Sequence, residues 1–149
     1  MKVAVAFDHA GVPLHDAVIG AVEAAGHEAI DLGTDDDYPD SALKVGRAVA
    51  DGDADRGVIV CGSGAGVSVA ACKLPGIRAA CAHDHYTAAQ CVTHDDCNVL
   101  CLGARVIGSA VAAELVDAFV GSEFSGEERH VRRLGKVQQM ADRGLAASW

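Results

Sequence analysis

The chain has few aromatic residues, few prolines and no surplus of positive charge. Its 149 residues include three Phe, two Tyr, one Trp and three Pro. The formal net charge is −9, because 21 acidic side chains outnumber 12 lysines and arginines. Proteins that bind nucleic acids or membrane surfaces usually present a basic face, so this charge argues against both kinds of partner. No apolar run approaches the roughly 20 residues needed to span a bilayer.

We expect no secretory signal peptide, because Met1–Phe7 leads straight into a strand pattern without the apolar region and cleavage site of such a peptide. The expected location is therefore the reducing cytoplasm, where cysteines stay free. Half of the residues are hydrophobic, which allows a buried core, and the length suits one domain over residues 1–149. Most of the six cysteines lie among small apolar residues and are expected to pack as small hydrophobes: 61, 72, 81, 91, 97 and 101.

Short apolar runs alternate with amphipathic segments along the whole chain. Strands are expected at Val3–Phe7, Glu28–Leu32, Gly57–Cys61, Ala79–Ala82 and Val99–Leu102. Helices are expected at Pro13–Ala25, Pro39–Ala50, a short stretch ending near Lys73, Asp84–Thr93, Ser109–Val120 and Glu127–Arg143. This alternation predicts βαβ units with right-handed crossovers. The expected fold is a Rossmann-like α/β three-layer sandwich with a five-stranded parallel sheet and a C-terminal helix.

Ligands of open parallel sheets bind at the carboxyl ends of the strands. The segments expected there are Asp8-His9, Cys61–Gly66, His83-Asp84 and Gly103–Arg105. Asp8-His9 ends the first strand and should lie on the same rim as Cys61–Gly66. A simple capping role for Asp8-His9 is the alternative.

The segment Cys61–Gly66 (CGSGAG) joins a strand to a helix. Its closely spaced glycines let the backbone approach a ligand, and its successive N–H groups attract negative charge. The spacing is neither the dinucleotide fingerprint nor a phosphate-binding P-loop. Cys61 would lie near a helix N-terminus, a setting that favours a thiolate able to act as a base or nucleophile. The alternatives are a tight turn without a ligand and a packed thiol.

Two further clusters contain titratable groups. Arg129 and Arg133 lie four residues apart on the last predicted helix and repel each other by about a few tenths of a kcal/mol, which a bound anion would relieve. Arg132 is expected to pair with Glu128, and a solvated basic surface remains the alternative for the other two arginines. His94 is suited to proton transfer near neutral pH. Although it stands between two cysteines, a second matching pair is missing, so no metal is expected.

Taken together, these residues resemble the ribose-5-phosphate isomerase B family, whose wider group includes galactose-6-phosphate isomerase subunits. The similarity runs in order from residue 2 to about 140. It rests on six motifs: Val5–Gly11, Asp37–Asp40, Cys61–Gly66, Ala70–Lys73, Asn98–Leu100 with Gly103–Arg105, and Arg129-His130 with Arg133.

The resemblance implies a metal-free and cofactor-free isomerase that interconverts ribose 5-phosphate and ribulose 5-phosphate through an enediol. His94, supported by Asp8, would help to open the furanose ring, and Cys61 would move the proton between C2 and C1. Ser63 and the loop backbone would stabilise the enediolate oxygens. The remaining implied site residues are Gly62, Gly64, Ala65 and Gly66 in the loop, Tyr38, Asp95 and Asn98 around the sugar, and His9, Arg105, Arg129, His130 and Arg133 at the phosphate.

The resemblance also implies a homodimer, or a dimer of dimers, whose subunits share each active site; the C-terminal helix would contribute to the phosphate site and the dimer. Some family branches place a glutamate base where this chain has Val67, which leaves Cys61 as the only base in the loop. The family usually has asparagine where this chain has Asp95, so other four- to six-carbon sugar phosphates stay open as substrates. A non-catalytic nucleotide- or phosphate-binding module, and a redox or zinc protein, are the alternatives from other classes.

Overall fold

The computed structural model describes all 149 residues and contains one parallel sheet of five strands. The strands are β1 (Lys2–Asp8), β2 (Glu28–Asp35), β3 (Arg56–Cys61), β4 (Ala79–Cys81) and β5 (Val99–Gly103). Their spatial order is β2-β1-β3-β5-β4, and every neighbouring pair is parallel. The predicted α/β class with a five-stranded parallel sheet is confirmed.

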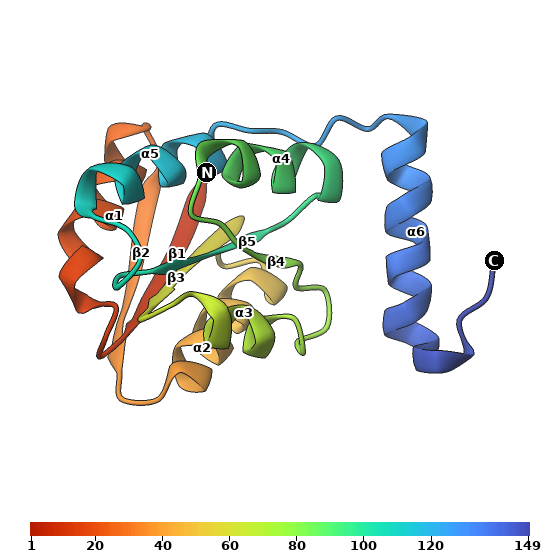
Figure 1. Cartoon of the computed structure of the whole chain (residues 1–149), viewed down its shortest axis with the longest axis horizontal. Helices are drawn as coiled ribbons and strands as arrows, with labels where there is room; N and C mark the ends of the chain where they lie inside the picture. Colours follow the sequence, from red (N-terminus) through yellow and green to blue (C-terminus); the bar gives the residue numbers. More distant parts are fainter.

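Helices cover both faces of this sheet, as a three-layer sandwich requires (Figure 1). One face carries α1 (His15–Ala24), α4 (His85–Asp95) and α5 (Ser109–Val120), and α5 packs against the other two. The opposite face carries α2 (Tyr38–Ala50) and α3 (Ala65–Ala71), which pack against each other. Each side encloses its own apolar cluster, one of 21 and one of 12 buried residues.

Alternate residues of the central strands point to these two clusters. In β1, Val3, Val5 and Phe7 belong to the larger cluster, whereas Ala4 and Ala6 belong to the smaller one beneath α2 and α3. Because both faces are covered, the strand has no solvent-facing side and its sequence is a continuous apolar run rather than an alternating one. The small residues on the second face allow α2 and α3 to approach the sheet closely.

Strand β2 is three residues longer than the predicted Glu28–Leu32. After a register irregularity opposite Val5 and Phe7, the ladder resumes and pairs Thr34 with Phe7 and Asp35 with Asp8. The Ser41 hydroxyl bonds both to the Phe7 carbonyl oxygen (2.8 Å) and to the Asp35 carboxylate (2.9 Å). These tertiary contacts extend the strand into the polar residues that follow Leu32.

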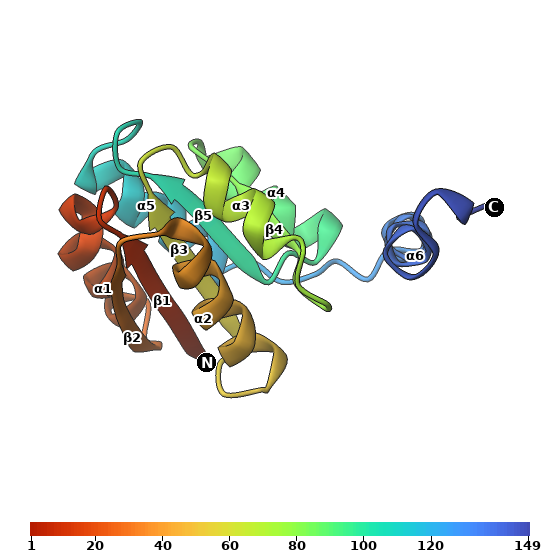
Figure 2. The same ribbon diagram turned by 90° about the horizontal axis from the view of Figure 1, so that it is seen from below.

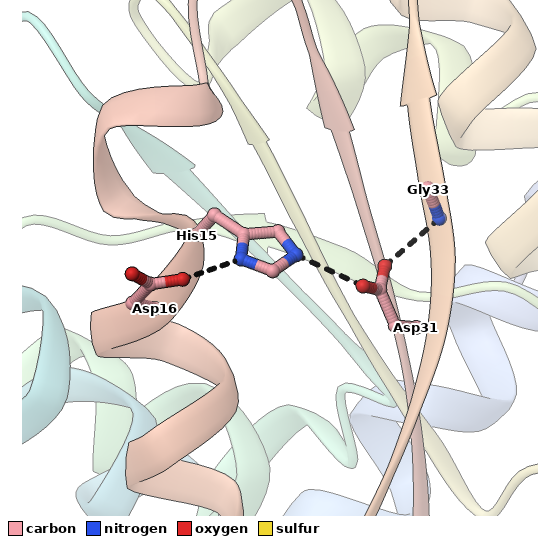
Figure 3. A network of polar contacts seen from close by, with 4 residues as sticks. All are labelled: His15, Asp16, Asp31 and Gly33. Atoms are coloured by element: carbon pink, nitrogen blue, oxygen red, sulfur yellow. Dashed lines mark hydrogen bonds and ion pairs between the residues drawn. The ribbon is translucent and has the colours of Figure 1, made fainter.

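A polar network joins α1 to β2 on the surface (Figure 3). His15 contacts Asp16 through Nδ1 and Asp31 through Nε2, both at 2.9 Å. Asp31 also accepts the N–H of Gly33 at 2.9 Å. The imidazole therefore bridges two carboxylates that belong to different elements. Helix α1 begins at His15, after a 3-10 turn over Val12–Leu14 that contains Pro13, rather than at Pro13 itself.

The last helix, α6 (Glu128–Arg143), stands apart from the sandwich and is followed by a 3-10 turn over Gly144–Ala146 (Figures 1 and 2). Its only buried residue is His130. Several large apolar side chains of α6 are exposed, among them Val131, Val137 and Met140. None of the helices combines the length and the apolar character needed to cross a membrane.

Candidate active site

Two adjacent strand ends form the centre of the candidate site. Phe7 of β1 is paired with Val60 of β3, so Asp8 and Cys61 follow at the same level of the sheet. The chain leaves β1 toward β2 on one side and leaves β3 toward β5 and β4 on the other. Such a reversal of strand order is where open α/β sheets bind ligands. The structure therefore brings Asp8 and Cys61 to one rim, as predicted.

The Asp8 carboxylate is buried and fixed by its own turn. Its Oδ1 accepts the N–H groups of Ala10 (2.8 Å) and Gly11 (2.9 Å). Oδ2 has no hydrogen-bond partner within the chain and is available to a bound molecule. The next residue, His9, contacts the Asp36 carbonyl oxygen through Nδ1 at 3.0 Å, so this nitrogen donates and Nε2 is left as the acceptor.

The glycine-rich loop holds the Cys61 sulfur against a backbone donor. The N–H of Gly64 donates to Sγ of Cys61 at 3.0 Å. Gly64 has a φ of +78°, and a β-carbon there would lie 2.7 Å from Sγ of Cys81, so only glycine fits this turn. Ser63 accepts the N–H of Ala65 on its hydroxyl at 3.3 Å. A backbone N–H directed at a sulfur stabilises negative charge on it, which suits a thiolate base.

Backbone hydrogen bonds from the end of β5 support the glycine-rich loop. The N–H of Ala104 donates to the Cys61 carbonyl oxygen at 2.8 Å, and that of Arg105 donates to Gly62 at 3.0 Å. A β-carbon on Gly103 would come within 2.6 Å of the Ser63 backbone, so β5 and the loop are in direct contact. The Arg105 side chain consequently lies beside Gly62, 3.5 Å from the position of a β-carbon there, and its implied phosphate role stays a prediction.

His83 is a site residue whose role the sequence did not reveal. It was expected only to lie on the carboxyl rim, and it does, but its Nε2 also accepts the N–H of Gly103 at 3.0 Å. The imidazole thereby holds the strand end that supports Ser63. Only a pairing between β4 and β5 brings these residues together, and nothing in the local sequence predicts that pairing.

The Tyr38 ring covers the other side of the loop. Tyr38 is the first residue of α2, and its ring atoms lie 3.1–3.2 Å from the position of a β-carbon on Gly66. The side chain is 43% exposed, so one face of the ring remains open to a ligand. The ring therefore borders the glycine-rich loop, and the sugar-binding role that the resemblance implies for Tyr38 stays a prediction.

A second set of predicted site residues lies at the amino ends of the strands, opposite the Cys61 group. Val99, the first residue of β5, is paired with Gly57, whereas Gly103 at its other end is paired with Cys61. The four residue steps between them span about 13 Å at ~3.3 Å per residue. His94, Asp95 and Asn98 immediately precede β5 and so lie at its amino end. Within one chain the structure does not bring His94 together with Cys61.

His94 is held by a second histidine. Its Nδ1 lies 2.9 Å from Nε2 of Gln90, and its ring stacks on that of His130 with centroids 4.1 Å apart. His130 is 1% exposed, and its Nδ1 lies 2.7 Å from the Ser125 hydroxyl. Burial, followed by the neighbouring His94 and Arg129, lowers the pKa of His130. Although predicted to bind phosphate, His130 is therefore buried against His94.

The turn after α4 is braced by side chains from other elements. The Asn98 amide accepts the N–H of Arg78 (2.9 Å) and donates to the Gly76 carbonyl oxygen (2.9 Å). Arg78 in turn bonds to the Asp96 carbonyl oxygen (2.7 Å) and carboxylate (2.6 Å), and Asp96 takes a positive φ of 47°. Asn98, predicted to line the sugar site, thus uses its amide within the fold, whereas Asp95, at the end of α4, is exposed.

The two predicted phosphate-binding arginines of α6 accompany His94. Arg129 and Arg133 both act on the pKa of His130, which places them around the same histidine pair. Arg129 pairs with Glu127 at 2.9 Å, and Arg133 has no acidic partner within the chain. The ion pair expected between Arg132 and Glu128 is absent, and neither side chain has another ionic partner within 4.0 Å. The candidate site thus consists of two groups, one around Cys61 and one around His94.

The His, Cys, Asp and Glu side chains of the chain form no group of three or more that could hold a metal ion. All six cysteines are free thiols. Cys91 and Cys97 share a thiol–thiol hydrogen bond, which lowers the pKa of Cys91 and raises that of Cys97. These two cysteines flank His94 in the sequence, but they do not form a metal-binding group with it.

Comparison with known proteins gives one consistent result. Residues 3–137 match the model of the Ribose/Galactose Isomerase family. Ribose-5-phosphate isomerase B of Escherichia coli is 38% identical over 95% of this chain and 97% of its own length. D-erythrulose-4-phosphate isomerase 2 of Mycolicibacterium smegmatis is 35% identical over 92% and 95%. The solved structure of type B ribose 5-phosphate isomerase from Trypanosoma brucei superposes with a TM-score of 0.89 at 48% identity, over 92% of this chain and 96% of that one.

Proposed function

The chain belongs to the ribose/galactose isomerase family and is a sugar phosphate isomerase, and we propose that it interconverts ribose 5-phosphate and ribulose 5-phosphate. The observation that most supports the proposed mechanism is the Cys61 sulfur, which accepts the Gly64 N–H at a strand end adjacent to that of Asp8. An aldose–ketose isomerase needs a base of this kind next to a polar cradle for the enediolate.

In the proposed reaction, His94 and Asp8 open the furanose ring to the free aldehyde. The Cys61 thiolate then removes the proton from C2, and the electron pair of that C–H bond moves toward the carbonyl to form an enediolate. A proton then passes from the C2 hydroxyl to the C1 oxygen, so that the negative charge moves to the C2 oxygen. The thiol returns its proton to C1 as the carbonyl forms at C2. With Gly64 donating to Cys61 and Ala65 to Ser63, the remaining N–H groups of the loop and the Ser63 hydroxyl would meet the enediolate oxygens.

We further propose that each active site is shared between two copies of the chain. The Cys61 group lies at the carboxyl ends of the strands and the His94 group at their amino ends, yet the proposed reaction needs both. An open cavity of about 1190 Å³ separates the exposed apolar side of α6 from the sandwich and is lined by Val131, Leu134 and Val137 among others. Exposed apolar surface of this kind marks an interaction site. A homodimer that fills it would bring the His94 group of one protomer to the Cys61 group of the other.

In this arrangement the phosphate would be bound by Arg129 and Arg133 of one protomer. His9 and Arg105 of the other protomer would bind it as well. Guanidinium pairs suit phosphate because each can donate two parallel hydrogen bonds. The free thiols are in keeping with the cytoplasm, which is the location that we propose.

Complementation between two inactive variants tests the shared site. Cys61→Ala and His94→Ala are each expected to lose turnover as homodimers. Unfolded together at equal concentration and refolded, they should regain about one quarter of wild-type activity, because half of randomly paired dimers are mixed and each mixed dimer has one complete site. Absence of any recovery, with dimers present in a sizing column, would contradict a shared site.

The sugar itself needs a separate experiment. A relative named for D-erythrulose 4-phosphate, together with Asp95 at a position where the resemblance implies asparagine, favours a four-carbon sugar phosphate as the second candidate substrate. Isomerisation of a panel from tetrose to hexose phosphates should be measured with excess chelator for wild type, Cys61→Ala and the matched thiol control Cys72→Ser. Highest kcat/KM on ribose 5-phosphate, lost only in Cys61→Ala, is expected. A higher value on a tetrose phosphate would change the substrate and keep the mechanism.

A further inference from the structure

His130 is buried more completely than any other residue of α6, and the proposed reaction gives it no chemical step. It ranks among the largest fully buried side chains, although a helix that stands away from the sandwich supplies it. A polar ring is buried in such a place only if it has partners, so the contacts of His130 indicate its role.

These contacts connect His130 to His94 in two ways, through Ser125 and Thr93 and through direct stacking. The N–H of Ser125 donates to the carbonyl oxygen of Thr93, the residue before His94, at 3.0 Å. The Ser125 hydroxyl lies 2.7 Å from Nδ1 of His130 and also accepts the N–H of Glu127 at 3.3 Å. The His130 ring then stacks on His94 at 4.1 Å. Ser125 therefore ties the end of α4, the linker and the start of α6 to one another.

Gln90 makes a second contact with the His94 ring. Its side-chain N–H donates to Nδ1 of His94 at 2.9 Å. Because Nδ1 accepts, a neutral His94 carries its proton on Nε2, the only ring nitrogen without a partner in the chain. This tautomer can give a proton to the ring oxygen of a furanose. Stacking on one face and the hydrogen bond at Nδ1 together fix where Nε2 points.

The charge state of His130 also suits a supporting role. Burial contributes most to its lowered pKa, followed by the neighbouring His94 and Arg129; Arg133 acts in the same direction and Glu127 in the opposite one. A neutral ring can stack on His94 without placing another positive charge between the arginines. A phosphate ligand would instead need an exposed N–H, which a 1% exposed side chain does not offer.

We propose that His130, held by Ser125, is a positioning residue that fixes the ring of His94 for opening the sugar, and that it is not a ligand of the phosphate. This inference rests on the proposed function, since His94 must take part in the reaction. It separates ring opening from phosphate binding, and the two roles can be measured independently.

The test uses three variants and one acyclic ligand. His130→Phe keeps a stacked ring and loses the Ser125 contact, Ser125→Ala removes the hydroxyl, and Arg133→Ala is the control for phosphate binding. Turnover is measured on ribose 5-phosphate, which must be opened. Binding of 5-phosphoribonate, an open-chain acid with the same phosphate, is measured by calorimetry. We expect both His130→Phe and Ser125→Ala to lower kcat about tenfold while the Kd for 5-phosphoribonate stays within about twofold.

Arg133→Ala should instead weaken 5-phosphoribonate binding about tenfold or more. Ser125→Thr keeps the hydroxyl and should restore most of the turnover that Ser125→Ala loses. The proposal is overturned if His130→Phe weakens 5-phosphoribonate binding as Arg133→Ala does. It is also overturned if His130→Phe and Ser125→Ala both turn over ribose 5-phosphate normally. Should His130→Phe not fold, Ser125→Ala against Ser125→Thr decides alone. Failure of wild type to isomerise any sugar phosphate, or normal turnover by His94→Ala, would instead refute the proposed mechanism itself.

Discussion

The Tyr38 ring lies directly against Gly66, so close that a β-carbon on Gly66 would come within 3.1 Å of the ring. Gly66 belongs to the first turn of α3, and Tyr38 begins α2. Helix α2 and the glycine-rich loop are therefore in contact through a position that has no side chain.

Gly66→Ala is expected to displace the tyrosine ring without unfolding the protein, because Tyr38 is partly exposed and free to rotate. KM for the sugar phosphate should rise about three- to tenfold, while the melting temperature stays near wild type, since alanine favours the helix. Gly20→Ala is the matched control, because this exposed glycine of α1 has nothing within 4 Å of its β-carbon position. Equal KM values for the two variants would show that the Tyr38 ring does not line the site.

Arg56 is expected to contribute strongly to stability. Its guanidinium donates to the carbonyl oxygens of Phe119, in the last turn of α5, and Ser122, just beyond it, and lies 5.3 Å from the centroid of the Phe119 ring. Arg56→Met leaves those partly buried carbonyls without a donor and should lower the free energy of unfolding by about 2–3 kcal/mol. Lys44→Met, which removes only a solvent-exposed ion pair with Asp35, should cost less than about 1 kcal/mol. Urea titrations compare the two variants, and similar losses would argue against a capping role for Arg56.

The His15 bridge should make stability depend on pH (Figure 3). Hydrogen bonds to Asp16 and then Asp31 raise the pKa of His15, and the bond to His15 lowers the pKa of Asp31. The His15 contribution is therefore full below its ordinary value of about pH 6.5 and disappears as pH rises through the raised pKa. The Asp31 contribution is full above about pH 4 and is lost as pH falls through the lowered pKa.

His15→Gln should therefore melt below wild type at about pH 5.5, and the difference should shrink at about pH 8.5. The effect is well under about 1 kcal/mol, because the groups are exposed and screened by water and salt. Thermal melts at the two pH values, each with and without added salt, measure it. A difference in melting temperature that grows toward alkaline pH would contradict a stabilising role for protonated His15.

Asp95→Asn should increase turnover of ribose 5-phosphate if the exposed carboxylate faces the enediolate in the shared site. Removing one negative charge near a developing anion is expected to raise kcat/KM about three- to tenfold at low ionic strength, and less in high salt. Asp117→Asn, on exposed α5 surface, controls for the change in net charge. Unchanged kinetics in Asp95→Asn at every salt concentration would mean that the Asp95 side chain faces away from the sugar.

Much of the fold followed from local patterns. Continuous apolar runs such as Val3–Phe7 could only be strands covered on both faces, and the carboxyl-edge rule correctly placed Asp8 beside Cys61. The bounds of α5 coincide with the predicted Ser109–Val120, because its apolar periodicity is strong and Gly121 follows it. These features depend on neighbours along the chain or on general rules of sheet topology.

What could not be predicted depends on tertiary neighbours. His130 lies in a run of basic residues that reads as an exposed surface, and only the packing of α6 against α4 buries it against His94. The Arg132–Glu128 spacing permits an ion pair, but in the structure Glu127 pairs with Arg129 instead. Likewise, the bond between His83 and Gly103 exists only because β4 lies next to β5.

The two outer strands of the sheet also determine how molecules of this protein can meet. At one edge, β4 has only three residues and offers few unpaired backbone groups to another chain. At the other edge, β2 carries Asp31 and Asp35 and is interrupted at Gly33, whose φ is +82°. Short, charged or irregular edges disfavour strand addition from a second molecule. The sheet is thus protected against edge-to-edge aggregation, and its helical surfaces are left as the route by which copies can associate.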